Sequence, residues 1–328
     1  MAQNRKRIFT MKKIIFIFLL LNTNWLFSQE IITSFRFAHF EEGKKIWEMK
    51  AEKGETNKEK DEIYLKNFLV KFYEDGQAIS RLRAENGKID EKNKQMLGKD
   101  NVRIESLKEK IKINTEEVTY SSQEKKIFSS SSVEIKRNET LIKGEGLETT
   151  PDFAHISIRQ NVSSFNPERK FTISSEKMEI FQEKGVVEFK NKVKFSKEKS
   201  TLTADYLSYQ EKEQIVETEG NNELFLESTS GEKIKINAEK IIFYEKDEHI
   251  YAQGKVKIEQ GQNYALSEEA YYFGKDEKLV LTGGPPLVCQ NEEKRQGKYQ
   301  AEKVTFFLKE KRISFEGNVQ GTITYAEE

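Results

Sequence analysis

The 328-residue sequence has one cysteine, four prolines, no excess of charge of either sign and a single long apolar run. Because disulfide scaffolds need paired cysteines, the lone Cys289 excludes that class. Lysine plus arginine and aspartate plus glutamate both number 55, and this zero net charge argues against a nucleic-acid partner. One apolar run excludes a polytopic membrane protein. Proline has no amide hydrogen for a β-ladder, so its scarcity favours a chain of paired strands.

Catalytic and cofactor motifs are also missing. His39, His155 and His249 are far apart, and none has a second metal ligand at helical or strand spacing. The sequence contains no phosphate-binding loop, dinucleotide fingerprint or nucleophile elbow. We therefore predict no catalytic residue, no metal site and no cofactor, and expect a binding or structural protein and not an enzyme.

The first 28 residues have the features of a secretory signal. A basic stretch, residues 5–13, precedes the apolar run 14–21, and the small residue Ser28 follows. Eight apolar residues are too few for a bilayer, which needs about 20. Residues 1–28 are predicted to form a short hydrophobic helix that is either a cleaved signal or an anchor in the inner membrane. Both alternatives place the rest of the chain outside the cytoplasm.

A repeat runs through the remaining chain. Short strand-like segments recur eight times at gaps of 29 to 32 residues. Between them, a small residue followed by an acid, such as Ala204-Asp205, alternates with a charged turn and with Gly/Asn kinks such as 220–222. The strand-like segments begin at Val102, Val133, Val162, Val193, Leu224, Val256, Val288 and Val319.

Within the repeats, apolar and charged residues alternate. Residues 187–195 carry apolar side chains at odd positions, except Asn191, and charged ones at even positions. This period of two predicts antiparallel strands with one dry and one wet face. One hairpin cannot bury its apolar face alone, but stacked copies share an interior. The predicted fold is all-β: an elongated antiparallel β-jellyroll or sandwich of ~31-residue repeats, with unpaired strand edges at its two ends.

Two functions fit such an interior. The interior is either a sealed core, as in a stalk or adhesin of the cell envelope, or it opens along its length and holds a lipid. A buried methylene contributes about 0.8 kcal/mol, so a chain of about 14 carbons in water costs about 10 kcal/mol. A lipid that crosses an aqueous compartment therefore needs a covered apolar path. Alternation alone leaves both alternatives open.

Several short motifs, weak singly, are fairly specific in their order and spacing. Those of the first half are Trp47–Gly54, Val70–Tyr73, Ala84–Asp90, Asn101-Val102 and Gly144–Leu147. Those of the second half are Ala204-Asp205, Ala238-Glu239, Gly254–Val256, Leu281–Val288, Ala301-Glu302 and Gly317–Val319. With these motifs, the chain resembles two lipopolysaccharide-transport periplasmic proteins of the OstA-like family joined end to end. Residues 31–166 resemble the LptC type and residues 167–328 the LptA type, with a seam at 163–167.

The resemblance implies a β-jellyroll whose groove carries the acyl chains of lipopolysaccharide or a related lipid. It also implies head-to-tail self-association through edge strands, an inner-membrane ABC transporter complex and an outer-membrane barrel receptor as partners. The strand expected to dock a partner consists of Thr322, Ile323, Thr324 and Tyr325. The residues expected to line the groove are Trp47, Phe72, Val102, Ile104, Phe189, Val193, Phe195, Ile236, Phe243, Val256, Ile258, Phe306 and Phe315.

Overall fold

A computed structural model describes residues 30–57, 61–227, 231, 233–292 and 295–325. The predicted signal or anchor at 1–28, with its expected helix, lies outside these residues. Within the described part of the chain every regular element is a β-strand, which confirms the all-β prediction. The described residues contain no helix that is both long and apolar enough to cross a membrane.

The first twelve strands are β1 (Glu30–Glu41), β2 (Lys44–Asn57), β3 (Glu62–Glu74), β4 (Gln77–Asp90), β5 (Gln95–Ser106), β6 (Ile111–Ser121), β7 (Lys126–Arg137), β8 (Thr140–Thr149), β9 (His155–Asn166), β10 (Phe171–Ser175), β11 (Lys177–Phe181) and β12 (Val186–Lys197). The others are β13 (Ser200–Gln210), β14 (Ile215–Glu227), β15 (Lys233–Tyr244), β16 (His249–Gln260), β17 (Asn263–Phe273), β18 (Lys278–Thr282), β19 (Leu287–Glu292), β20 (Arg295–Gln300), β21 (Lys303–Phe307), β22 (Arg312–Glu316) and β23 (Gln320–Tyr325).

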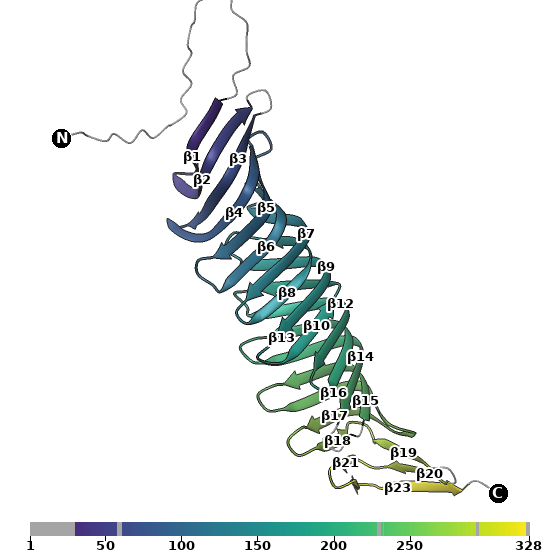
Figure 1. The fold of residues 1–328 in the computed structure, drawn as a ribbon. Coiled ribbons are helices and arrows are strands. Elements are labelled where there is room, and N and C mark those ends of the chain that lie inside the picture. Colours follow the sequence, from purple (N-terminus) through teal and green to yellow (C-terminus); the bar gives the residue numbers. More distant parts are fainter. Residues whose placement is uncertain (1–29, 58–60, 228–230, 232, 293–294, 326–328) are drawn as a thin grey trace, which may run out of the picture.

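The strands form an antiparallel meander that runs the length of the molecule, from β1 at one end to β22 and β23 at the other (Figure 1). β9 pairs with β8 on one side and with both β10 and β11 on the other. The predicted seam at 163–167 therefore falls at the end of a paired strand and in the turn that follows it. The ladder passes from one half of the chain to the other without a break.

Most of the long strands bend near their middle, where the pairing register shifts. In β5 the shift lies between Lys99 and Val102, and in β14 between Glu219 and Asn222. Asn101 (φ 51°) and Gly220 (φ 83°) at these places adopt positive φ, which β-bulges require and which Asn and Gly tolerate. The predicted Gly/Asn kinks are thus the bends that fold each strand into two halves.

The repeated acid stabilises the bend. Asp205 accepts hydrogen bonds from the backbone nitrogen of Asn221 (3.1 Å) and from its side-chain Nδ2 (2.9 Å). Asn101 donates in the same way to Glu85 (2.6 Å), again 16 residues earlier. The acid therefore satisfies donors that the bulge removes from the ladder.

The two halves of the bent strands enclose one continuous apolar interior. Aromatic rings from different repeats meet across it: Phe72 packs edge-on against Tyr120 at 4.9 Å between ring centroids, and Phe195 lies 6.2 Å from Phe243. Burial of this apolar surface, at roughly 25 cal/mol per Å², is the main stabilising contribution to such a fold.

At four places among the described residues the strand is interrupted at its bend: between β10 and β11, β18 and β19, β20 and β21, and β22 and β23. β10 and β11 are separated by Glu176, and both pair with β9 and with β12. Near the carboxyl terminus, Pro285 and Pro286 separate β18 from β19, because proline cannot donate to the ladder. Beyond them the two layers continue as separate ladders, β18–β21–β22 and β19–β20–β23.

Candidate functional site

All thirteen predicted groove residues point into the continuous interior and belong to one packed cluster. Their alternation therefore predicted the correct face of every strand concerned. Ten of them are buried, and Phe243, Phe306 and Phe315 are partly exposed. All three partly exposed residues lie in the second half of the chain. At the amino-terminal end, Phe37 and Ile46 are also partly exposed against the same interior. Whether the thirteen predicted groove residues contact a lipid stays a prediction.

Two rows of turns border the interior on the side opposite the bends. Backbone hydrogen bonds link successive turns of the first row, for example from Glu245 N to Gln214 O (3.1 Å) and from Leu308 N to Glu277 O (2.9 Å). We call the gap between the two rows the mouth. The first row consists of turns 91–94, 122–125, 150–154, 182–185, 211–214, 245–248, 274–277 and 308–311, and the second of turns 42–43, 75–76, 107–110, 138–139, 167–170, 198–199 and 261–262.

Ion pairs cross the mouth from one row to the other. Near the amino-terminal end, Lys125 Nζ lies 3.0 Å from Glu41 Oε2. Farther along, Glu245 pairs with Arg169 (3.4 Å) and with Lys197 (3.5 Å). Each pair joins residues more than 45 positions apart in the sequence. These contacts therefore connect the two layers across the mouth and do not join adjacent strands within one layer.

The most buried of the crossing contacts is made by Arg137, at the end of β7. Its Nε and Nη2 donate to Gln182 Oε1 at 3.1 and 2.9 Å, and Nη2 also donates to Glu211 Oε2 at 2.8 Å. The Arg137 side chain is 8% exposed and that of Glu211 is 29% exposed. A buried guanidinium is stable only when it is paired and hydrogen-bonded, and here both partners come from the opposite turn row.

A cavity of about 180 Å³ lies directly beneath Arg137. It coincides with the interrupted strand β10–β11, and we call it the join cavity. Most of its lining residues are polar or charged, among them Arg137, Glu168 and Arg169. The apolar part of its lining consists of Ile142, Phe171, Ile173, Ile180, Val187 and Phe189.

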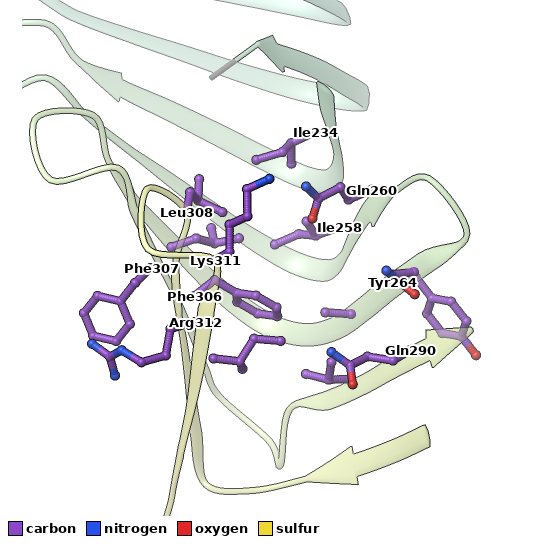
Figure 2. A pocket seen from close by; sticks show the side chains of 15 residues that line it. Ile234, Ile258, Gln260, Tyr264, Gln290, Phe306, Phe307, Leu308, Lys311 and Arg312 are labelled. Atoms are coloured by element: carbon purple, nitrogen blue, oxygen red, sulfur yellow. The ribbon is translucent and has the colours of Figure 1, made fainter. Parts of the chain in front are cut away.

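A second cavity of about 180 Å³ opens near the carboxyl terminus, at the other interrupted strands. We call it the terminal cavity. Figure 2 shows Phe306 and Ile258 at its floor, with Lys311 extending between Ile234 and Gln260 at its rim. Arg312 lies 3.8 Å above the ring of Phe307. An apolar floor with polar and cationic groups at the rim suits an amphiphile with an acidic head.

The electrostatics around the interior are those of ion pairing and burial. The Lys125 ammonium beside Glu41 holds the pKa of that carboxyl below its ordinary value. Burial raises the pKa of Tyr120, in the interior, to about 12. Lowered carboxyl pKa values mark structural pairs at the mouth and not a proton-transfer site.

No cluster of three His, Cys, Asp or Glu side chains capable of holding a metal occurs among the described residues. Cys289 is a buried free thiol. His155 stacks on Phe181 with 5.0 Å between ring centroids, and His249 stacks on Tyr244 at 4.3 Å. These two histidines therefore pack against aromatic rings.

The predicted docking strand is β23, which pairs with β20 along one edge and is exposed throughout. Ile323 and Tyr325 are 45% and 67% exposed. At the other end, β1 pairs with β2 and exposes Ile31 and Phe40. Both ends of the described sheet thus present a strand edge with apolar side chains.

Sequence reasoning missed the crossing ion pairs. Gln182 and Glu211 lie in the charged turns of the repeat, and their contacts with Arg137 span 45 and 74 residues. Nothing local marks such a pair. The available signal was the repeat itself, because stacked turns of similar length fix which turn of one row faces which turn of the other.

Family models match both halves of the chain. Residues 31–166 match LptC, described as "Lipopolysaccharide-assembly, LptC-related", and residues 172–312 match LptD_N, described as "LptA/(LptD N-terminal domain) LPS transport protein". The predicted resemblance of the two halves is confirmed. Neither description names a catalytic activity.

Among solved structures, the chain is similar to LptH from Pseudomonas aeruginosa, described as the LptA homologous periplasmic component of the conserved lipopolysaccharide transport device. The alignment has 13% identity and a TM-score of 0.34, and it covers 36% of this chain and 85% of that one. A search of curated proteins finds no match.

Proposed function

We propose that this chain, LptC-related in residues 31–166 and LptA-like in residues 172–312, is a non-enzymatic periplasmic bridge for lipopolysaccharide. It holds the acyl chains in its apolar interior during export to the outer membrane. The observation that carries the proposal is the continuity of that interior through both regions, because separate carriers would each need a hand-over at this point.

The ends of the sheet supply the contacts of the bridge. β1 faces an inner-membrane ABC transporter complex, and β23 faces an outer-membrane barrel receptor or a second copy of the chain. An exposed strand edge binds such partners by β-augmentation, in which main-chain hydrogen bonds extend the sheet. The amino-terminal segment either directs export or retains the chain at the inner membrane.

The alternative is a structural stalk with a sealed core. It is favoured by the burial of ten of the thirteen predicted groove residues. The terminal cavity favours the bridge, since a stalk gains nothing from partly exposed Phe306 and Ile313 beside a cavity with an apolar floor.

Photo-crosslinking in cells with labelled lipopolysaccharide separates the two functions. A photoreactive residue at Phe306 is expected to give lipid adducts. The same residue at Phe225, an aromatic position that is 42% exposed on the outer face of β14, is the matched control and is expected to give none. Absence of adducts at Phe306 in a folded protein would favour the stalk.

The same series tests the docking edge. A photoreactive residue at Ile323 is expected to give adducts with protein and not with lipid. Loss of these adducts when the adjacent backbone is blocked by Thr322→Pro or Thr324→Pro supports β-augmentation. Unchanged adducts in both variants would show that β23 does not dock through its edge.

A further inference from the structure

One row of residues on the outer face of the sheet changes character along the molecule. The row follows the strand ends beside the first turn row, and its members pair from strand to strand. Before β9 it contains Glu62, Asp90, Gln95, Ser121 and Lys126. From β9 onward it includes Phe181, Ile215, Tyr244, His249, Phe273 and Phe307. The same row is therefore polar in the LptC-related region and largely apolar or aromatic in the LptA-like region.

The aromatic part of the row is widened by a second pair of rings. Tyr251 and Tyr271 occupy the adjacent outer positions of β16 and β17, and their rings stack at 4.7 Å between centroids. In the first row, His249 lies 4.3 Å from Tyr244 and 6.2 Å from Phe273. We call this set of partly exposed side chains the aromatic patch, and it consists of Tyr244, His249, Tyr251, Tyr271, Phe273 and Phe307.

The stability of the sheet alone does not explain the aromatic patch. Cross-strand aromatic pairs stabilise a sheet wherever they occur, yet the same ladder continues through the LptC-related region with Gln95 paired to Ser121 in this row. Adjacent apolar side chains that stay partly exposed are a feature of interaction sites. The concentration of rings in one section therefore points to a contact that this section makes.

Polar groups lie among the rings. Glu269 accepts a hydrogen bond from the hydroxyl of Tyr251 (3.1 Å) and lies 3.5 Å from that of Tyr271. A phenol that donates one hydrogen bond can still accept another, and a carboxylate has further lone pairs. At the end of the patch, the Arg312 guanidinium lies 3.8 Å from the centre of the Phe307 ring. The patch thus combines flat rings with both donors and acceptors of hydrogen bonds.

This combination is the one that a saccharide requires. One face of many pyranose rings presents mainly C–H groups, which pack on the electron-rich face of an aromatic ring. The hydroxyls at the edge of the sugar donate and accept hydrogen bonds. An alkyl chain would gain nothing from Glu269 and would cover a charged group without giving it a partner.

The aromatic patch is continuous with the terminal cavity. Phe306 and Phe307 are neighbours on β21, and because successive strand residues face opposite sides, Phe306 points to the interior and Phe307 to the outside (Figure 2). Phe307 and Arg312 also belong to the lining of that cavity. An acyl chain that lies on Phe306 therefore has its polar head at a rim where the aromatic patch begins.

We propose that the aromatic patch binds the saccharide portion of the lipopolysaccharide whose acyl chains lie in the interior. The inference rests on the proposed function and adds a second contact outside the interior. The rings of Phe307, Phe273 and His249 are stacking positions along the row, and Glu269 with its two tyrosines supplies the hydrogen bonds. The carrier thereby recognises both parts of an amphiphile, the apolar chains inside and the sugars outside.

Saccharide binding tests the patch without lipid. The probe is the water-soluble carbohydrate that mild acid hydrolysis releases from lipopolysaccharide, and its dissociation constant for the full chain is measured by titration calorimetry. Tyr251→Thr combined with Tyr271→Thr removes two rings and keeps residues that favour a strand. This variant is expected to bind at least tenfold more weakly than the unaltered chain.

Tyr64→Thr is the matched control. Tyr64 is 43% exposed on the outer face of β3, outside the aromatic patch, and like Tyr251 it donates to a glutamate, Glu62, at 2.6 Å. Its replacement should leave the dissociation constant within twofold. Unchanged binding in the double threonine variant, or no measurable binding by the unaltered chain, overturns the proposal.

Nitration of the unaltered chain keeps the test decisive if the double threonine variant does not fold. The rate at each tyrosine is followed by mass spectrometry with and without the carbohydrate. The carbohydrate should slow nitration of Tyr251 and Tyr271 at least threefold and leave the rate at Tyr64 unchanged. Equal protection of all three tyrosines, or protection of none, overturns the proposal.

Two comparisons identify the source of the saccharide and separate this inference from the proposed function. Soluble peptidoglycan fragments should bind at least tenfold more weakly, and equal or tighter binding overturns the assignment to lipopolysaccharide. If the carbohydrate binds at the aromatic patch but a photoreactive residue at Phe306 gives no lipid adducts, the proposed function fails and the patch is still a saccharide site. If Phe306 gives lipid adducts and the carbohydrate does not bind, this inference fails and the proposed function is unaffected.

Discussion

The join cavity and the terminal cavity have similar volumes but differ in the pairing of the strands around them. Each lies at an interrupted strand, each has an apolar floor, and each measures about 180 Å³. Over the join, β10 and β11 both remain paired with β9 and β12, so the two layers stay in one ladder. Beyond Pro285 and Pro286 the layers continue as separate ladders. The residues at the breaks, Glu176 and 283–286, line neither cavity, so what distinguishes the surroundings of the two cavities is the pairing of the strands.

The largest expected contrast is between two phenylalanines, one in each cavity. Phe189 is 2% exposed at the join, and Phe306 is partly exposed at the terminal cavity. Truncation of a buried Phe to Ala typically costs about 3–5 kcal/mol, through lost transfer energy and a residual cavity. Phe189→Ala should therefore lower the free energy of unfolding by about 3–5 kcal/mol, and Phe306→Ala by less than about 2 kcal/mol, in denaturant titrations. Equal losses would mean that the terminal cavity is as well packed as the join.

A smaller contrast concerns tyrosine ionisation at high pH. Tyr120 is 1% exposed in solid core, and burial raises its pKa to about 12; Tyr272, on the inner face near the terminal cavity, has a pKa that burial also raises. Between pH 10 and 12 the unfolded chain loses the Tyr120 proton while the folded chain keeps it, so stability falls as pH rises through this window. Two pKa units at 1.36 kcal/mol each give a loss of about 2–3 kcal/mol.

The measurement is unfolding at pH 8 and pH 11.5 in parallel variants. Tyr120→Phe should remove most of its alkaline loss, whereas Tyr272→Phe should remove less, since its surroundings are more open. A larger effect from Tyr272→Phe than from Tyr120→Phe would contradict the difference in burial between the two tyrosines.

How much of this was predictable depends on the range of the interaction. Alternation of period two placed Phe189 and Ile236 inside, because side-chain direction in a strand is set residue by residue. The 31-residue period predicted the stacking, since each repeat must cover the apolar face of its neighbour. Arg137 could not be predicted to be buried, because its partner Glu211 is 74 residues away and both look like ordinary surface charges. The cavities likewise depend on pairing between strands, although Pro285 and Pro286 did mark the place where the ladder must break.

The smallest expected effect tests whether the strand bends are stabilised equally in the middle of the chain and near the carboxyl terminus. Gly220, near the middle of β14, has φ +83°, and an added Cβ would clash with Asp205 Oδ2. Gly317, between β22 and β23, has φ +73°, and an added Cβ would clash with Glu302 Oε2. Alanine at either position must adopt a left-handed backbone and displace the acid that stabilises the bend. Each substitution should cost about 1–2 kcal/mol.

Gly43→Ala is the matched control, because Gly43 has φ +78° but nothing within 4 Å of the added Cβ. Its cost is expected to be the backbone strain alone, about 1 kcal/mol or less. The excess at Gly220 and Gly317 then measures the contact with the acid. Equal excess at both positions would show that the acid stabilises the bend to the same extent near both cavities. A clearly smaller excess at Gly317 would show that the bend is less tightly packed near the carboxyl terminus.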